Sequence, residues 1–246
     1  MVDTLERWGT PKKDWLHAVR SLRRLLENKE DTRQVFEIMR TLNGKATARN
    51  YLRLLETVDG GRLAFERQEL SHRLMDDAFL DALPEGSVGA AYRDFVRSEN
   101  LSAHGLVRIS REGVKTIDDP HPYAWFGRRV RDVHDIWHVL TGYGRDSLGE
   151  GSLVWFSYAQ TRGKGWALIG LGAIWRATQH KGHPYVRSLI EGYRRGRRAA
   201  WLLGEDYERL LREPLDVARR RLNITPGAIY DSIPVTARDR AVQKPA

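Results

Sequence analysis

The amino-acid sequence predicts an all-α fold: a single multi-helix domain of roughly ten helices with little or no sheet. Two observations lead to this prediction. Apolar residues recur at steps of three and four along most of the chain, which is the spacing of a helix that buries one face. No linker rich in proline, glycine or serine divides the chain, and no internal repeat is visible, so the helices are expected to share one core. With 246 residues the chain is long enough to bury such a core.

The helices predicted in the first part of the chain are separated by turn residues. Asp14 is a suitable N-cap for the first of them. The apolar residues expected to face inward from this helix recur at helical spacing: Leu16, Val19, Leu22, Leu25 and Leu26. Four more helices are expected at 31–42, 46–57, 73–83 and 87–101. Breaks are expected between them, at Asn43-Gly44, Asp59-Gly60-Gly61 and Pro84-Glu85-Gly86.

Residues 102–120 are the irregular part of the chain. Their apolar residues fit a short strand pair around Glu112-Gly113 and fit a loop equally well. Asp118-Asp119-Pro120 is then expected to cap a central helix. The apolar stripe of this central helix continues without a break: Phe126, Val130, Val133, Trp137 and Leu140.

The remainder of the chain is again predicted to be helical. The expected segments are 150–161, 166–179, 185–203, 205–212 and 215–222. We therefore divide the chain into a flexible N-terminus at 1–12, a helical domain at 13–225 and a C-terminal tail at 226–246.

The composition limits the chemistry that the chain can perform. It contains no cysteine, which excludes disulfides, thiolate metal sites and a cysteine nucleophile. Histidine, carboxylate and water are therefore the expected ligands of any metal. The net charge of +9 implies attraction to polyanions, either nucleic acid or an anionic membrane. No nucleic-acid-binding motif is present, so we expect no nucleic acid partner; a solvated basic face is the simpler alternative.

The sequence contains no segment that is expected to cross a membrane. Its longest apolar run, 166–175, has ten residues, whereas a membrane span needs about 20. The N-terminus carries Asp3 and Glu6 and has no apolar core, unlike a signal peptide or an organelle presequence. We expect a protein that is soluble or lies on a membrane surface.

One stretch, HDIWHVLTGYGRDSLGE at 134–150, concentrates residues that bind metals. His134 and His138 are four residues apart, so on a helix their rings lie one turn apart on the same side. Asp135 follows the first histidine, and Glu150 follows a break that contains two glycines. Two imidazoles with one or two carboxylates match the ligands of a divalent ion.

The helical positions of these residues leave two alternatives open. On a continuous helix both histidines fall at the flank of the buried stripe, and Asp135 reaches the same place as a ligand or as an acceptor that fixes an imidazole. Asp132 lies further round and is expected to be a solvent-exposed charge. Ser147 and Glu150 have the spacing of a capping box, in which Glu150 would bond to the backbone of Ser147 instead of a metal.

Other known metal motifs fit less well. The HExxH motif needs a glutamate beside the first histidine, and di-iron bundles need two Glu-x-x-His segments. A phosphohydrolase of the His-Asp type needs a further upstream histidine, for which His104 or His121 is available. The pair His180 and His183 is interpreted as a helix end near the surface.

The same stretch, with its pattern of His-Asp, two residues, His, eleven residues and Glu, resembles the signature of the coenzyme Q (ubiquinone) biosynthesis protein 4 family. The segments LPEGSVGAAYRDFVRSENL at 83–101 and GYRRGRRAAWLLGEDYERLLREPLDVARRRLNI at 192–224 also resemble parts of that family. The resemblance covers roughly residues 70–225, in the same order.

The resemblance implies an all-helical protein that binds a divalent metal, usually zinc, at His134, Asp135, His138 and Glu150. It implies a role late in ubiquinone biosynthesis: removal of the ring carboxylate from a polyprenylated hydroxybenzoate, as a carboxy-lyase or in an oxidative version that installs a hydroxyl. Asp135 and Glu150 are the expected catalytic carboxylates. The alternative is a non-catalytic scaffold that binds prenyl lipid and organises the other enzymes of the pathway.

The expected partners follow from the same resemblance. They are a polyprenylated benzoquinone precursor, an anionic membrane surface, other ubiquinone-biosynthesis enzymes and a second copy of the chain in a homo-oligomer. The expected location is cytoplasmic, on the inner face of a bacterial inner membrane, or the matrix side of the mitochondrial inner membrane in a eukaryote. The arginines expected to face the lipid are Arg187, Arg194, Arg195, Arg197, Arg198 and Arg219 to Arg221.

Overall fold

The computed structural model of the protein describes residues 13–29, 31–99, 121–180 and 184–242. Within these ranges the chain is helical and forms no strand, and an isolated bridge joins Ser87 to Pro214. The prediction of an all-α fold is confirmed. The flexible N-terminus at 1–12 and the strand pair or loop at 102–120 lie outside the described residues.

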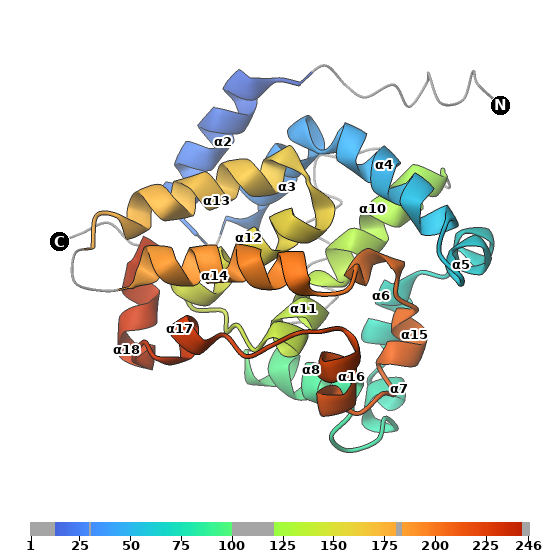
Figure 1. The fold of residues 1–246 in the computed structure, drawn as a ribbon. Coiled ribbons are helices and arrows are strands. Elements are labelled where there is room, and N and C mark those ends of the chain that lie inside the picture. The colour runs from blue at the N-terminus through green and yellow to red at the C-terminus, as the bar shows by residue number, and fades with distance from the viewer. Residues whose placement is uncertain (1–12, 30, 100–120, 181–183, 243–246) are drawn as a thin grey trace.

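Three long helices form the centre of the fold: α12 (Ser147–Thr161), α13 (Lys164–Ala177) and α14 (Tyr185–Arg198). They run side by side across the middle of Figure 1, and α12 packs against both of the others. The backbones of α12 and α14 come close because Gly192 has no side chain: a Cβ there would lie 2.3 Å from the carbonyl oxygen of Ser152. As a result α12 is buried on almost all sides, and the side chains that project from it have a fixed base.

The first two helices, α2 (Trp15–Glu27) and α3 (Thr32–Leu42), pack on each other and against α13. Asp14 caps α2 as predicted, since its carboxylate accepts a hydrogen bond from the N–H of His17 at 2.9 Å. The predicted inward face is wrong at two positions: Leu16 is 62% exposed and Val19 is 50% exposed. Leu25 faces the core as predicted and is buried there together with Ala18, and Leu22 packs against the same cluster.

The next helices are α4 (Gly44–Leu55), α5 (Gly60–Glu66), α6 (Leu70–Leu74) and α7 (Asp77–Asp81). The predicted break at Gly60-Gly61 is in fact the start of α5. The single helix predicted at 73–83 is two short ones, because the carboxylate of Asp76 accepts from the N–H of Phe79 and begins a new helix there.

The predicted central helix is also divided into two helices. It consists of α10 (Pro122–Asp132) and α11 (His134–Thr141), which meet at Val133. His121 is the N-cap of α10, while the predicted cap at 118–120 lies outside the described residues. The first turn of α8 (Val88–Ser98) is held by the carbonyls of Leu211 and Glu213, and α8 packs against α11.

The C-terminal part contains more helix than predicted. After η1 (Leu202–Gly204), α15 (Tyr207–Leu210) and α16 (Leu215–Arg221), the segment that we named a C-terminal tail forms α17 (Ala228–Asp231), α18 (Val235–Arg238) and η2 (Asp239–Val242). Tyr230, Ile233, Ala237 and Ala241 of this segment are buried in the main core. These residues therefore belong to the folded domain.

Two arginines that were expected to face a membrane are structural. Arg195 is 5% exposed, and its guanidinium donates to the carbonyls of Thr141, at 2.7 Å, and of Thr225. Arg219 donates to the carbonyls of Val139 and Leu140 at 2.8 and 2.9 Å. Both side chains satisfy carbonyls in the last turn of α11, where positive charge is favourable.

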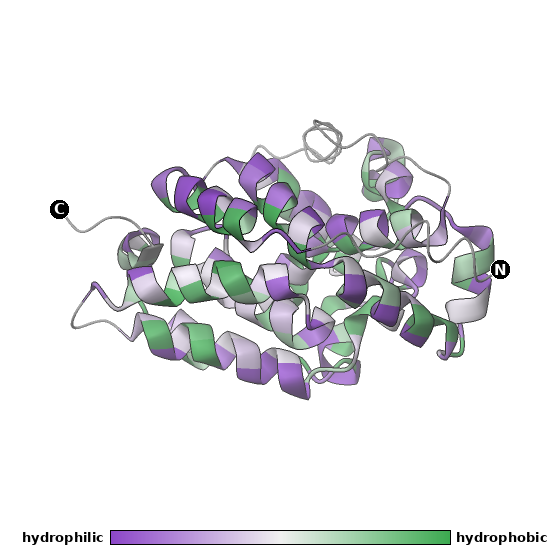
Figure 2. Ribbon diagram, turned by 90° about the horizontal axis from the view of Figure 1, so that it is seen from above, coloured by the Kyte–Doolittle hydropathy of each residue, from purple (hydrophilic) through white to green (hydrophobic). Residues whose placement is uncertain are grey.

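Hydrophobic and hydrophilic residues alternate around the outer helices, as Figure 2 shows from above. This is the pattern of amphipathic helices that surround a shared core. None of the described helices is both long and apolar enough to span a bilayer.

Candidate metal centre

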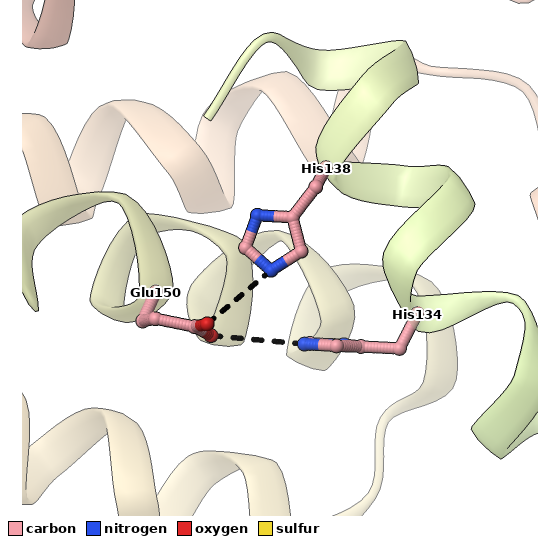
Figure 3. A group of neighbouring side chains, drawn as sticks. All are labelled: His134, His138 and Glu150. Atoms are coloured by element: carbon pink, nitrogen blue, oxygen red, sulfur yellow. Dashed lines mark ion pairs between the residues drawn. The ribbon is translucent and has the colours of Figure 1, made fainter. Parts of the chain in front are cut away.

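The two histidines and the glutamate of the 134–150 segment converge on one point. His134 and His138 project from successive turns of α11, and Glu150 projects toward them from the first turn of α12 (Figure 3). Among the described residues, these three side chains form a group whose ligand atoms all lie within 4.8 Å of one another. The structure thus brings together three of the four metal ligands expected from the sequence.

The spacing of the ligand atoms fits a small divalent ion. The Nε2 atom of His138 lies 3.5 Å from Oε1 of Glu150, and Nε2 of His134 lies 3.7 Å from Oε2. Neither separation is a good hydrogen bond. Ligands about 2.1 Å from a tetrahedral ion lie about 3.4 Å from each other. These two separations and the donor types match a site that could hold a divalent metal ion through three protein ligands.

The ring of His138 is held in the orientation that a metal requires. Its Nδ1 atom lies 2.8 Å from the carbonyl oxygen of Tyr143, so Nδ1 carries the proton and donates it. Its Nε2 atom is buried and has no hydrogen-bond partner, which leaves a lone pair directed at the site. Phe95 stacks on the ring with centroids 5.3 Å apart and fixes its plane. A buried lone pair without a partner is costly unless an ion occupies it.

His134 forms the more open side of the site. Its side chain is 24% exposed, and its ring stacks on Trp166 of α13 with centroids 5.7 Å apart. The rings of His134 and His138 meet edge to face at 5.1 Å. α13 therefore reaches the site through Trp166, which the sequence analysis placed only in the apolar run at 166–175.

Charge interactions among the three side chains shift the pKa values of Glu150 and His138. Burial raises the pKa of Glu150, but the imidazoles of His138 and His134 outweigh it and hold the pKa well below its usual range. Burial likewise disfavours the charged form of His138, and the Glu150 carboxylate reverses this, so the pKa of His138 lies above its ordinary value. Glu150 is thus a carboxylate at neutral pH, which is the form that binds a metal.

The capping alternative for Glu150 is excluded by the geometry. The N-cap of α12 is Asp146, whose carboxylate accepts from the N–H of Gly149 at 2.9 Å. Ser147 is the first residue inside the helix and does not cap it. The carboxylate of Glu150 therefore remains available to face the histidines.

Asp135, the fourth expected ligand, is not part of this group. It lies close enough for its charge to raise the pKa of His138 and of Tyr92.

Asp132 is only 4% exposed, so the prediction of a solvent-exposed charge is wrong. The helix is interrupted at Val133, so angles calculated for one continuous helix do not apply across it. Burial raises the pKa of Asp132 to about 6, and Arg131 pairs with it.

The other histidines proposed as ligands do not reach the site. His121 caps α10 and contacts Tyr123, and His180 packs edge to face on Tyr185. His104 and His183 lie outside the described residues. Within the described part of the chain, the additional upstream histidine of a phosphohydrolase is therefore not present beside His134 and His138.

Arg145 is a functional candidate that the sequence analysis missed. Its Nε atom lies 3.7 Å from Oε1 of Glu150, and Nη1 lies 3.9 Å from Oε2 of Glu99. Both distances exceed a hydrogen bond, so its N–H donors remain for an anion bound beside the three ligands. Its position within the 134–150 signature was the available signal.

A cavity of about 250 Å³ lies elsewhere, between α5, α10 and α15. Its lining contains Arg129, which forms a two-pronged ion pair with Glu208. None of the three candidate metal ligands lines this cavity. The cavity and the candidate metal ligands are therefore two separate places in the fold.

Comparison with known proteins identifies the family. The model of the family described as "Coenzyme Q (ubiquinone) biosynthesis protein Coq4" matches residues 10–227. The chain belongs to the Coq4 family. The Coq4 family is involved in ubiquinone biosynthesis, and the resemblance seen in the sequence is confirmed.

Curated Coq4 relatives are similar over most of the chain. The mitochondrial COQ4 homologue of Nematostella vectensis is 32% identical over 157 residues, covering 61% of this chain and 71% of the relative. The homologue of Bos taurus is 31% identical over 191 residues, covering 74% and 69%. The homologue of Homo sapiens is 31% identical over 176 residues, covering 70% and 63%. This chain thus spans about two thirds of the length of these relatives.

A crystal structure of a protein from Nostoc punctiforme has a similar fold. The TM-score is 0.62 at 20% identity, and the match covers 87% of this chain and 97% of that chain. At this level of identity the likeness concerns the fold alone.

Proposed function

We propose that this Coq4 protein is a metal-dependent carboxy-lyase that removes the ring carboxylate of a polyprenylated hydroxybenzoate in ubiquinone biosynthesis. The observation that carries the proposal is the convergence of His134, His138 and Glu150 around a buried, unpartnered Nε2 atom. The family's involvement in ubiquinone biosynthesis supports a substrate from this pathway.

Three residues would hold the ion, for which we propose Zn²⁺: His134 and His138 through Nε2, and Glu150 through its carboxylate. When bound, Zn²⁺ supplies positive charge that stabilises negative charge developing on the substrate's oxygen atoms. In the reaction the bond between the ring and the carboxylate breaks, carbon dioxide leaves, and the electron pair remains on the ring carbon. That carbon then takes a proton.

Asp135 is proposed as the carboxylate that handles this proton. It neighbours His134 in the chain and is not one of the three grouped ligands. Its charge acts on both His138 and Tyr92, which supports a role near the site. A carboxylate that is not engaged by the ion is free to exchange a proton with the substrate.

Arg145 is proposed to bind the anionic group of the substrate. A guanidinium can hold a carboxylate through two parallel hydrogen bonds and so orient a planar ring. The side chain is 31% exposed, so its donors are accessible beside the ligands. This residue would select substrates that carry a negative group over neutral phenols.

The prenyl tail is proposed to run from the site along α13 toward an anionic membrane. Trp166 of α13 stacks on His134, and Leu171 and Trp175 of the same helix are more than half exposed. The neighbouring helix α2 exposes Trp15, Leu16 and Val19. Basic residues flank these apolar side chains: Arg20, Arg23 and Lys164 are exposed. Aromatic and aliphatic residues surrounded by cations are typical of a surface that lies on anionic lipid.

The same surface supports a second candidate function, a non-catalytic scaffold that holds prenyl lipid for other enzymes of the pathway. In that case the metal would be structural and the apolar surface of α2 and α13 would be the functional part. Under both proposals, we propose that the protein forms a homo-oligomer and works at the inner face of the membrane.

A turnover assay distinguishes the two functions. Purified protein loaded with Zn²⁺ is incubated with a short-chain prenylated hydroxybenzoate, and loss of the carboxylated compound is followed by mass spectrometry. The enzyme proposal expects multiple turnovers that disappear in His134→Ala and Glu150→Gln. Tight binding of the compound by folded protein without any decarboxylation would support the scaffold instead.

A further inference from the structure

The loop between α11 and α12 determines how the ligands are placed. Its residue Tyr143 provides the carbonyl that accepts from Nδ1 of His138 at 2.8 Å. Its residue Gly144 lies against the first turn of α12, where a Cβ on Gly149 would lie 2.1 Å from the Gly144 carbonyl oxygen. The loop therefore touches both ligand-bearing helices, and a shift of the loop would move His138 relative to Glu150.

A single hydroxyl group from the C-terminal segment holds this loop. The hydroxyl oxygen of Tyr230, on α17, accepts a hydrogen bond from the N–H of Gly144 at 3.0 Å. The same hydroxyl donates to the carboxylate of Asp146 through a short hydrogen bond. The other oxygen of Asp146 accepts from the N–H of Gly149 at 2.9 Å and so caps α12. The Tyr230 hydroxyl thereby links the loop backbone to the cap of the helix that carries Glu150.

The position of Tyr230 is itself fixed from several sides. Glu191 of α14 accepts hydrogen bonds from the N–H groups of Ile229 and Tyr230, the shortest at 3.0 Å. The guanidinium of Arg238 lies 4.1 Å from the centroid of the Tyr230 ring, and Tyr143 meets that ring edge to face at 5.2 Å. With 2% of its surface exposed, the side chain of Tyr230 has no freedom to leave the loop.

We propose that Tyr230 is a positioning residue for the metal centre. Its hydroxyl keeps the Tyr143 carbonyl directed at Nδ1 of His138, so that Nε2 faces the ion, and keeps the first turn of α12 at the distance that Glu150 requires. The inference rests on the proposed metal site. Tyr230 lies beyond residues 10–227, which the family model matches, so the family signature does not contain it.

The test replaces Tyr230 by phenylalanine in the full-length protein. Y230F removes both hydrogen bonds of the hydroxyl and keeps the ring. We expect the affinity for Zn²⁺, measured by competition with a chromogenic chelator, to fall about 10- to 100-fold, as is typical when a group that orients a ligand is removed. With Co²⁺ as the probe, the visible absorption bands should shift, because the ligand geometry changes.

The matched control is Tyr185→Phe. The Tyr185 hydroxyl is also buried and donates to the carbonyl of Ala237 at 2.7 Å, which belongs to the same C-terminal segment and not to the 142–146 loop. Both variants should lower the unfolding temperature by a similar amount. Only Y230F should change the Zn²⁺ affinity and the Co²⁺ spectrum, and Y185F should stay within about twofold of the wild type in affinity.

A second variant guards against a folding defect in Y230F. Asp146→Asn keeps an oxygen that accepts from Gly149 and remains a good N-cap, but loses the charged acceptor of the Tyr230 hydroxyl. It should weaken Zn²⁺ binding in the same direction. If Y230F and D146N are folded and keep the wild-type Zn²⁺ affinity and Co²⁺ spectrum, the positioning role of Tyr230 is overturned, and the proposed metal site is not affected. A wild-type protein that binds neither ion would overturn the metal site and this inference with it.

Discussion

At the residue scale, the decisive feature is that the two ring nitrogens of His138 have different roles. Nδ1 donates a hydrogen bond, whereas Nε2 is buried without a hydrogen-bond partner. The sequence predicted that His134 and His138 share a helix face and that Glu150 lies near them, because those relations depend only on spacing and on the family signature. The sequence did not predict that Nδ1 of His138 meets the Tyr143 carbonyl, or that Tyr230 holds this loop. Tyr230 comes 86 residues after Gly144, and only the tertiary fold brings them together.

Asp135 provides a prediction that separates metal binding from proton transfer. Because Asp135 is outside the group of three ligands, Asp135→Asn should bind Zn²⁺ within about tenfold of the wild type. Its turnover should fall by at least about 100-fold, since general acid–base groups typically contribute factors of 10² to 10⁴. Equilibrium dialysis and the decarboxylation assay measure the two quantities. A parallel loss of metal and activity would make Asp135 a ligand instead.

Arg145 provides a prediction about substrate choice. Arg145→Gln should raise KM for the carboxylated substrate by about 10- to 100-fold, because a charge-assisted, two-pronged hydrogen bond is lost. Competition by a neutral phenol analogue should not change. Arg187→Gln is the matched control, since Arg187 is an exposed arginine on α14. Equal KM values in wild type and R145Q would remove Arg145 from the binding site.

At the scale of the helices, periodicity predicted the long elements and missed the short ones. α2, α3, α8, α12, α13 and α14 were all expected near their observed positions, because two or more turns reveal a buried face. α6, α7, α17 and α18 have only four or five residues, which is too short for a period of 3.6 to appear, whereas α15 lies within the segment predicted at 205–212. The interruption at Val133 was hidden because the apolar stripe continues through it.

Close contact between the loop and α12 predicts the effect of Gly149→Ala. Alanine is the better helix former by about 1 kcal/mol, so helix propensity alone predicts stabilisation. The new Cβ would lie 2.1 Å from the backbone oxygen of Gly144, so we expect a loss of more than about 2 kcal/mol and weaker Zn²⁺ binding. Urea unfolding measures the first effect. Gly127→Ala, which meets nothing within 4 Å, should be neutral or stabilising; a stabilised G149A would contradict the contact.

The cap of α15 predicts a dependence on pH. Burial raises the pKa of Asp206, but hydrogen bonds from the N–H of Arg209 and from Arg62 outweigh it, so this pKa lies below its ordinary value. A carboxyl whose pKa is lowered by folding stabilises the folded state at pH values above the pKa that it has in the unfolded chain. This stabilisation is lost as the pH falls through the lower pKa of the folded state. Asp206→Asn should therefore cost about 1–2 kcal/mol at pH 7. Urea unfolding should show a smaller difference at pH 3; a difference independent of pH would contradict this.

At the scale of the whole molecule, apolar residues on the outer sides of α2 and α13 are the proposed contact with lipid. The arginine face expected from the sequence loses two members, since Arg195 and Arg219 bind backbone carbonyls of α11. Sequence periodicity placed Leu16 and Val19 inward, because it cannot distinguish an apolar stripe that faces the core from one that is exposed.

Binding to vesicles tests this surface. The protein should sediment with anionic liposomes, and the binding should weaken as salt increases. Replacing Trp15, Leu171 and Trp175 by serine should reduce binding by at least about tenfold, because each side chain buries apolar area in the interface. Leu52→Ser with Phe65→Ser, two exposed apolar residues of α4 and α5, is the matched control. Equal losses in both variants would argue against α2 and α13 as the docking surface.

The central claim is that His134, His138 and Glu150 form a metal centre, and the stoichiometry of bound metal tests it most directly. Protein purified without chelators and dialysed against excess Zn²⁺ is analysed by elemental mass spectrometry. We predict one Zn²⁺ per chain in the wild type, and a loss of affinity of more than about 100-fold in folded His138→Gln and Glu150→Gln. No stoichiometric zinc in the wild type, or equal zinc in the variants, would contradict the account.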